Sequence, residues 1–165
     1  MAKRPTRLGL ISDTHGLLRE EALRALEGCE LILHAGDVGK REILEKLKSI
    51  APVIAVRGNV DTEDWCKELP TTTTVEAGDI SIYMLHNLRE LDLQPEAAGI
   101  SLVVSGHTHQ PARMERNGVI CINPGSAGPR RFALPITLGR LDLGRGAWNY
   151  ELIDLEGYRG QENAR

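Results

Sequence analysis

Short apolar runs alternate with longer amphipathic stretches through the first third of the chain. The runs at residues 8–11, 31–33 and 53–56 are bounded by Gly, Asp or Pro and are too short for helices, which is typical of buried parallel strands. The stretches between them, residues 17–26 and 41–48, have the apolar spacing of helices that cover one face of a sheet. Because parallel strands need a crossover connection, the pattern predicts a βαβαβ unit.

The rest of the chain is rich in short predicted strands. They lie at residues 72–75, 80–85, 102–104, 119–122, 136–138 and 148–150. Asn117-Gly118 is a strong hairpin signal, and one further helix is expected at about residues 91–98. A parallel half followed by a strand-rich half predicts the α/β class, with a layered αββα sandwich of two mixed β-sheets flanked by helices.

Length, charge and cysteine content limit what such a fold can be. The 165 residues predict one domain, 1–165, with about 157–165 as a flexible tail. A net charge of −3 and an aromatic content of 4% argue against stable nucleic-acid binding. No apolar stretch has the length of a signal peptide or a membrane span. Three cysteines without CxxC spacing suggest neither disulfides nor a thiolate zinc site, so a cytoplasmic protein is expected.

Polar residues suited to metal binding follow five of the apolar runs. These segments are Ser12–His15, His34–Asp37, Arg57–Asp61, His86–Asn87 and Ser105–His109. A lone Asp-x-His or His-x-His pair is more often a turn or a surface pair than a metal site. Here the segments all follow strands, and the carboxyl ends of parallel strands meet at one edge of a sheet. We therefore expect the candidate ligands to converge at that edge.

The order and spacing of these motifs resemble the calcineurin-like metallophosphoesterases, and within them the small prokaryotic phosphodiesterases. The resemblance runs from Leu8 to at least Ser126 and includes the element Asn123-Pro-Gly-Ser126. It implies that one metal ion is held by Asp13, His15, Asp37 and His109, and a second by Asp37, Asn59, His86 and His107.

The residue types fit the chemistry that the resemblance implies. Two ions about 3.5–4 Å apart are suited to a bridging carboxylate, and Asp37 would fill that role. Imidazole, carboxylate and amide donors suit Mn, Ni, Zn, Fe or Co better than Mg or Ca, and manganese is the metal expected first. A hydroxide that bridges the ions would attack a small phosphodiester in line. Asp37, Asn59 and His86 would act in catalysis by holding it.

One position departs from the family pattern. Many phosphatases of this superfamily carry Gly-Asn-His-Asp, whereas this chain has Val60 in place of that histidine. A missing general acid costs about 10²–10⁴ in rate for poor leaving groups and much less for good ones. The sequence therefore predicts a phosphodiesterase that prefers aryl or otherwise activated diesters to alkyl monoesters.

Several residues near the motifs allow two interpretations. Arg57 is expected either to bind a substrate phosphate or to form a structural ion pair. Arg130 and Arg131 either reach the mouth of the site or belong to solvated surface. His34 is expected to be buried and hydrogen-bonded rather than a ligand. Asp61 is expected to stabilise the turn or to orient a ligand histidine.

The main alternative function is a non-catalytic metal-binding scaffold for protein interactions on the same fold, as in a retromer subunit that resembles the family. Fold alone does not decide between the two. A scaffold has no need of all seven ligand positions, and all seven are intact here. Homo-oligomers are common among similar proteins, but nothing in the sequence identifies an interface.

Overall fold

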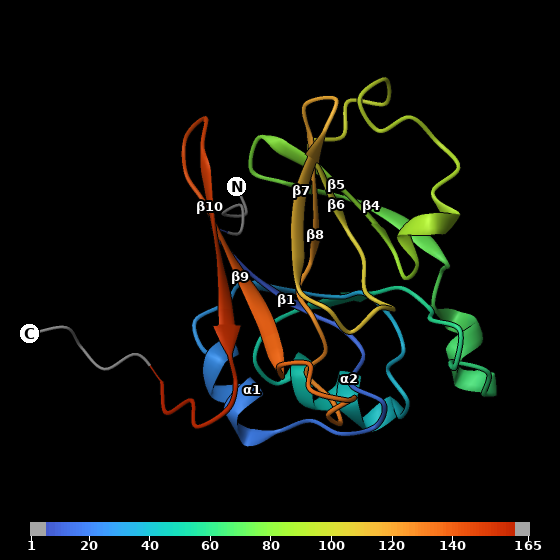
Figure 1. Cartoon of the computed structure of the whole chain (residues 1–165), viewed down its shortest axis with the longest axis vertical. Helices are drawn as coiled ribbons and strands as arrows, with labels where there is room; N and C mark the ends of the chain where they lie inside the picture. Colours follow the sequence, from blue (N-terminus) through green and yellow to red (C-terminus); the bar gives the residue numbers. More distant parts are fainter. Residues whose placement is uncertain (1–5, 161–165) are drawn as a thin grey trace, which may run out of the picture.

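Two β-sheets pack face to face in the computed structural model, which describes residues 6–160 (Figure 1). Within these residues the first sheet has the strand order β10-β9-β1-β2-β3, and the second has the order β4-β5-β6-β8-β7. The strands are β1 (Arg7–Ile11), β2 (Leu31–His34), β3 (Val53–Ala55), β4 (Thr72–Ala77), β5 (Ile80–Leu85), β6 (Leu102–Val104), β7 (Ala112–Arg116), β8 (Val119–Asn123), β9 (Thr137–Leu143) and β10 (Trp148–Asp154). The helices are α1 (Glu20–Leu26), α2 (Arg41–Lys48) and the short 3₁₀ helices η1 (Asp64–Glu68) and η2 (Leu88–Glu90).

The first sheet contains the predicted βαβαβ unit. Strands β1, β2 and β3 are parallel, with Leu10 opposite Leu33 and His34 opposite Ala55. Helices α1 and α2 lie below this sheet in Figure 1 and cover its outer face. Strands β9 and β10 extend the sheet in antiparallel pairing beside β1. The prediction of a parallel unit at the start of the chain is confirmed.

The second sheet is parallel at its centre and antiparallel at its edges. Met84 of β5, Val104 of β6 and Ile122 of β8 lie side by side across the three parallel strands. The predicted hairpin joins β7 to β8, and both Asn117 and Gly118 have positive φ angles, 53° and 79°. A two-residue turn of this kind matches the twist of the flanking strands.

The two sheets bury one apolar layer between them. Leu10 and Leu33 of the first sheet belong to the same buried cluster as Met84, Val104 and Ile122 of the second. A separate cluster lies between the first sheet and its two helices, so this sheet is covered on both faces. The predicted layered sandwich of two mixed sheets is therefore confirmed.

The prediction of a helix at residues 91–98 is wrong. The chain forms η2 at Leu88–Glu90 and then a series of turns. Pro95 disfavours helical geometry at the residue before it, and Gly99, at φ 75°, ends the single turn that follows. The outer face of the second sheet is thus covered by an irregular segment. Leu91 and Leu93 of this segment pack on the sheet.

Two further predictions concern the C-terminal tail and the cysteines. In the tail predicted at 157–165, residues 157–160 form neither helix nor strand, and residues 161–165 lie outside the described part. All three cysteines are buried and free. Between residues 6 and 160, no helix is both long and apolar enough to cross a membrane.

The layer between the sheets makes a direct prediction about stability. Leu10 is fully buried in it, and Leu10→Ala should lower the free energy of unfolding by about 2–5 kcal/mol because it leaves a cavity that the sheets cannot close. Leu152, on β10, is 45% exposed, so Leu152→Ala should change stability by no more than about 0.5 kcal/mol. Urea unfolding of both variants measures the difference. Equal losses would contradict the assignment of the main core to this layer.

Candidate metal centre

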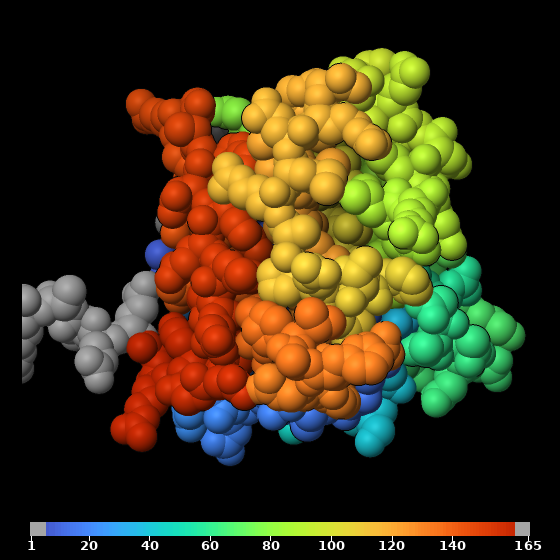
Figure 2. Space-filling view, viewed as in Figure 1, coloured from blue at the N-terminus to red at the C-terminus, as the bar shows by residue number. Residues whose placement is uncertain are grey.

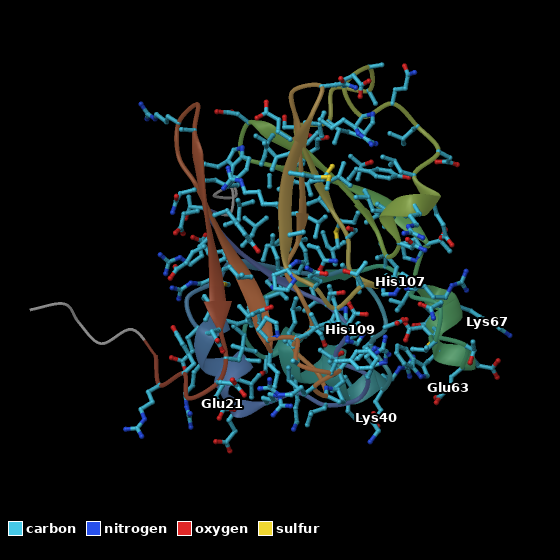
Figure 3. All side chains as sticks on the ribbon, in the orientation of Figure 1. Glu21, Lys40, Glu63, Lys67, His107 and His109 are labelled. Carbon is cyan, nitrogen blue, oxygen red and sulfur yellow. The ribbon has the colours of Figure 1, made fainter. Side chains whose placement is uncertain are left out.

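The loops that carry the predicted ligands converge as expected. They follow β1, β2, β3, β5 and β6, and five of the ligands form two overlapping groups in which the donor atoms all lie within 4.8 Å of one another. The first group is Asp13, His15 and His109, and the second is Asp13, Asp37 and His86. Figure 3 shows His109 near the centre of the molecule and His107 beside it, on the side of η1.

Ring nitrogens and carboxylate oxygens of the first group face one another. The Nε2 atoms of His15 and His109 are 3.2 Å apart. Asp13 Oδ1 lies 3.4 Å from His109 Nε2 and 3.7 Å from His15 Nε2, and Asp37 Oδ2 also lies 3.7 Å from His15 Nε2. Four donor atoms therefore point toward a common space, which is the arrangement that a cation requires.

The second group is centred on His86, whose orientation is set by the backbone. Its Nδ1 donates a hydrogen bond of 2.7 Å to the carbonyl of Ala35, so Nε2 is the free ring nitrogen. Nε2 lies 3.1 Å from Asp37 Oδ2 and 3.9 Å from Asp13 Oδ1. A ring nitrogen that faces two carboxylates needs either a proton or a metal ion.

Asn59 and His107 lie together on the exposed side of the cluster. His107 Nδ1 is 3.2 Å from Asn59 Oδ1, and the His107 ring meets the His86 ring edge-on with 5.2 Å between centroids. The backbone N–H of His107 donates to Asp13 Oδ2. The structure thus places these two predicted ligands beside the second group, where they face solvent.

The backbone at most of these positions is left-handed. Positive φ angles occur at Asp13 (55°), His15 (46°), Asp37 (56°), His107 (72°) and His109 (62°), which are five of the seven non-glycine residues with positive φ between residues 6 and 160. Each such conformation costs about 1–2 kcal/mol, and Asp and His tolerate it better than most residues. The sharp turns aim the side chains inward from the strand ends.

Two glycines allow the loops to approach the carboxylates. A Cβ atom on Gly58 would collide with the backbone nitrogen and Oδ1 of Asp37, and a Cβ on Gly106 would collide with the hydroxyl of Ser12. Gly58 precedes Asn59, and Gly106 precedes His107. A larger residue at either position would push a predicted ligand away from the centre.

Both carboxylates are held ionised in the interior. Burial alone would raise the pKa of Asp13, but His109, His15 and Ser12 outweigh it and hold that pKa well below its usual range. Burial likewise opposes ionisation of Asp37, and the opposing contacts with His86 and with the Val60 N–H lower its pKa. The centre therefore offers two anionic oxygens close together.

The same charges act on His86. Burial lowers its pKa, but Asp37 and Asp13 outweigh that effect and raise it. Asp13 Oδ1 and His86 Nε2 are both buried and form no hydrogen bond with the described residues. A buried carboxylate oxygen and a buried imidazole nitrogen without hydrogen-bond partners, close to a second carboxylate and further imidazole nitrogens, fit divalent transition-metal ions.

Two neighbouring residues behave as the sequence suggested. His34 is fully buried; it accepts a hydrogen bond from Gly36 N–H at Nδ1, and its Nε2 lies 3.0 Å from the Thr14 hydroxyl. Asp61 accepts backbone hydrogen bonds from Gly58, Val38 and Gly39 and so ties two ligand-bearing loops together. Both residues support the centre without belonging to it.

The sequence did not decide the roles of the arginines. It also gave no signal for some of the contacts that hold the carboxylates in place. Arg57 is half-buried, and its guanidinium forms no ion pair or side-chain hydrogen bond within the described part of the chain. Arg130 pairs with Glu156 and donates to the Leu134 carbonyl. The contacts that hold the carboxylates in place come largely from backbone N–H groups and from Ser12, which donates to Asp13. Backbone contacts leave no residue-type signal in a sequence.

Comparison with known proteins identifies the family. Residues 6–146 match the calcineurin-like phosphoesterase superfamily domain. The chain belongs to this superfamily. It is 34% identical over 143 residues to a protein named probable metallophosphoesterase from Methanothermobacter thermautotrophicus, with 78% of this chain and 81% of the relative covered. It is 30% identical over 160 residues to phosphodiesterase YfcE of Escherichia coli K12, with 82% of this chain and 87% of the relative covered.

The fold is also found outside these relatives. The vacuolar protein sorting 29 structure from Cryptosporidium parvum matches with a TM-score of 0.72 at 22% identity, covering 92% of this chain and 98% of that one. At this identity the likeness concerns the fold. The predicted family and fold class are confirmed, and membership implies divalent metal ions.

The buried histidine beside the centre predicts a pH effect on stability. Burial lowers the pKa of His34 to about 4, against about 6.5 in an unfolded chain. Above pH 6.5 both states are neutral there. As pH falls from 6.5 toward 4, only the unfolded state gains this proton, so stability should decrease by up to about 3 kcal/mol.

The variant His34→Gln isolates this effect, since Gln keeps an acceptor for Gly36 and a donor for Thr14 but does not titrate. Urea unfolding at pH 7, 5.5 and 4.5 should show a steeper loss of stability for the wild-type protein than for the variant. Parallel pH dependence in the two proteins would contradict a neutral His34 in the folded state.

Proposed function

We propose that this protein is a metal-dependent phosphodiesterase that hydrolyses small phosphodiesters. The observation that carries the proposal is the ligand set: seven suitable side chains on five loops, most of them in costly left-handed conformations, around two buried carboxylates. Such strain is retained where surrounding structure and function require it. The relative named phosphodiesterase YfcE supports the same activity.

The proposed ligand assignment follows the two sides of the cluster. Asp13, His15, Asp37 and His109 would hold one divalent ion, and Asp37, Asn59, His86 and His107 would hold the other. Asp37 Oδ2 supports the bridging role because it lies 3.1 Å from His86 Nε2 on one side and 3.7 Å from His15 Nε2 on the other. Manganese is the proposed metal, with nickel, zinc, iron and cobalt compatible with the same donors.

Two divalent ions supply Lewis-acid stabilisation of a phosphoryl group and acidify water. The side chains of this protein supply the charge balance of the centre and the orientation of the substrate phosphate. Asp13 and Asp37 contribute two negative charges, so the loaded centre keeps a positive charge that attracts an anionic diester. Asn59 and His107, on the exposed side, orient the phosphate, and Arg57 is proposed as a further phosphate contact.

The reaction that fits these residues is hydrolysis without a general acid. Water adds its oxygen to phosphorus, the ester P–O bond breaks, and the proton from water goes to solvent. Val60 stands where a histidine would protonate the leaving oxygen; its side chain is 46% exposed and carries no acidic group. Phenolate-type leaving groups, which depart unprotonated, are therefore the favoured substrates.

Metal dependence and the exposed ligands give the first test. Chelator-treated protein reconstituted with Mn²⁺, Ni²⁺ or Zn²⁺ should hydrolyse bis-p-nitrophenyl phosphate, and the metal-free protein should not. Asn59→Ala and His107→Ala should each reduce turnover by at least about 10–100-fold, the loss typical of residues that position metal ligands. Asn149→Ala, an equally exposed asparagine on β10, is the matched control and should keep wild-type turnover.

The scaffold alternative has a distinct outcome in the same experiment. Two metal ions bound tightly without turnover of any diester would overturn the phosphodiesterase proposal and favour a binding function. Metal content measured on each variant separates loss of the ions from loss of catalysis.

Val60 gives a second test. Val60→His should raise turnover of diesters with alkoxide leaving groups by about 10-fold, a part of the 10²–10⁴ that a well-placed general acid supplies. Turnover of p-nitrophenyl esters should change little, because p-nitrophenolate needs no proton. Val60→Asn, which cannot serve as a general acid in this pH range, is the control. An equal gain for both substrate types would contradict the role assigned to this position.

A further inference from the structure

A groove of about 1000 Å³ begins at the metal centre and runs over the outer face of the second sheet. Its near end is lined by Asn87 and His107, which adjoin or belong to the predicted ligands. Its floor includes Met114 of β7, and its walls are the segment after β5 and the loop at residues 131–134. This volume is at the upper end of the range of about 300–1,000 Å³ for small-molecule sites.

The groove exists because no α-helix between residues 6 and 160 covers the outer face of the second sheet. The irregular segment from residue 87 to 96 covers only part of the outer face. Figure 2 shows this segment in yellow-green, residues 105–110 in yellow and residues 128–135 in orange around the same face. A phosphodiester bound at the centre therefore has room for one of its two ester arms in the groove.

Phe132 gives the groove an unusual aromatic surface. Its side chain is 88% exposed, and its backbone has a φ of 53°. The left-handed backbone conformation costs free energy, and no apolar cluster among residues 6–160 includes this ring. A strained, exposed aromatic residue on a groove that joins a reaction centre is suited to stack on a planar group of a ligand.

The groove also carries a local positive charge. Arg89, Arg116 and Arg131 line it, together with one acidic residue, Glu96. None of these three guanidinium groups has an ion pair or side-chain hydrogen bond within the part of the chain that the structure describes. The whole chain has a net charge of −3, so the excess of arginine here is a local property. It favours an arm that carries negative charge of its own.

We infer that the groove binds a nucleotide-type ester arm of the substrate, in which a planar base stacks on Phe132 and a further phosphate meets the arginines. This inference rests on the proposed phosphodiesterase function and names its substrate class. An acyl chain fits less well because the three arginines interrupt the apolar lining. A nucleic-acid strand fits less well because, among residues 6–160, Phe132 is the only Phe, Tyr or Trp that lines the groove, so successive bases have no row of rings to stack on.

Substrates with one leaving group and different arms test the inference directly. We would measure kcat/KM of the manganese-loaded protein for p-nitrophenyl diesters whose second arm is methyl, octyl, thymidine, or thymidine with an added phosphate. Since p-nitrophenolate leaves in every case, differences report on the arm. Thymidine should exceed methyl by at least about fivefold, the lower bound for stacking one base, and the added phosphate should raise the value further in a salt-sensitive manner.

Two variants assign the effect to the groove. Phe132→Ala should remove the advantage of thymidine over methyl, mainly through KM, and Arg131→Ala should remove the increment from the added phosphate. Leu152→Ala and Arg145→Ala, at exposed positions outside the groove, are the matched controls and should keep both differences. Equal values for methyl and thymidine would overturn the inference. An advantage for octyl alone, or an equal loss on all substrates in Phe132→Ala, would overturn it too.

A binding measurement separates this inference from the proposed function. Calorimetric titration with thymidine bisphosphate, which contains no diester, reports on the groove without turnover. Binding weakened by Phe132→Ala in a protein that hydrolyses no diester would contradict the proposed function and support the groove assignment. Turnover of all diesters without binding of thymidine bisphosphate would support the proposed function and contradict the groove assignment.

Discussion

The arrangement of the loops in this protein depends on how two buried carboxylates are stabilised. Asp13 and Asp37 each lie in a group of donor atoms within 4.8 Å that also contains His86, and both are almost inaccessible to water. Like charges this close and this deep are unfavourable unless opposite charges and hydrogen-bond donors offset them. Histidine rings and the N–H groups of Val60 and His107 provide part of that offset, and the divalent ions that family membership implies would add to it.

The candidate ligands come from both sheets of the sandwich. The parallel strands of the first sheet end in three of the ligand loops, which carry both carboxylates, His15 and Asn59. The remaining histidines, including His86 and His109, come from β5 and β6 of the second sheet. The centre is complete only when the sheets pack face to face. The apolar layer between them therefore determines ligand geometry as well as stability.

Sequence reasoning succeeded where local chemistry dominates. Strand ends followed by Asp and His, and the Asn117-Gly118 turn, depend on neighbouring residues alone, so the two-sheet fold and the converging loops were predictable. The prediction of a helix at residues 91–98 was wrong because Pro95 and Gly99 leave room for only one turn between them. The left-handed backbone at Asp13 depends on contacts between distant segments, such as the hydrogen bond from its N–H to the Gly36 carbonyl, which spacing along the chain does not encode.

The distribution of strain links the centre to the groove. Among non-glycine residues between positions 6 and 160, positive φ angles occur at five candidate ligands, at the Asn117 turn and at Phe132. Ions that bind only the folded protein would stabilise it by about 2.7 kcal/mol when their concentration is 100 times the dissociation constant, which would offset the strain at the candidate ligands. Asn117 is offset by hairpin geometry. Phe132 lies in a turn closed by the Leu134 N–H, which donates to the Arg131 carbonyl. This turn accounts for its backbone conformation but not for the 88% exposure of its side chain, which the proposed ligand in the groove would cover.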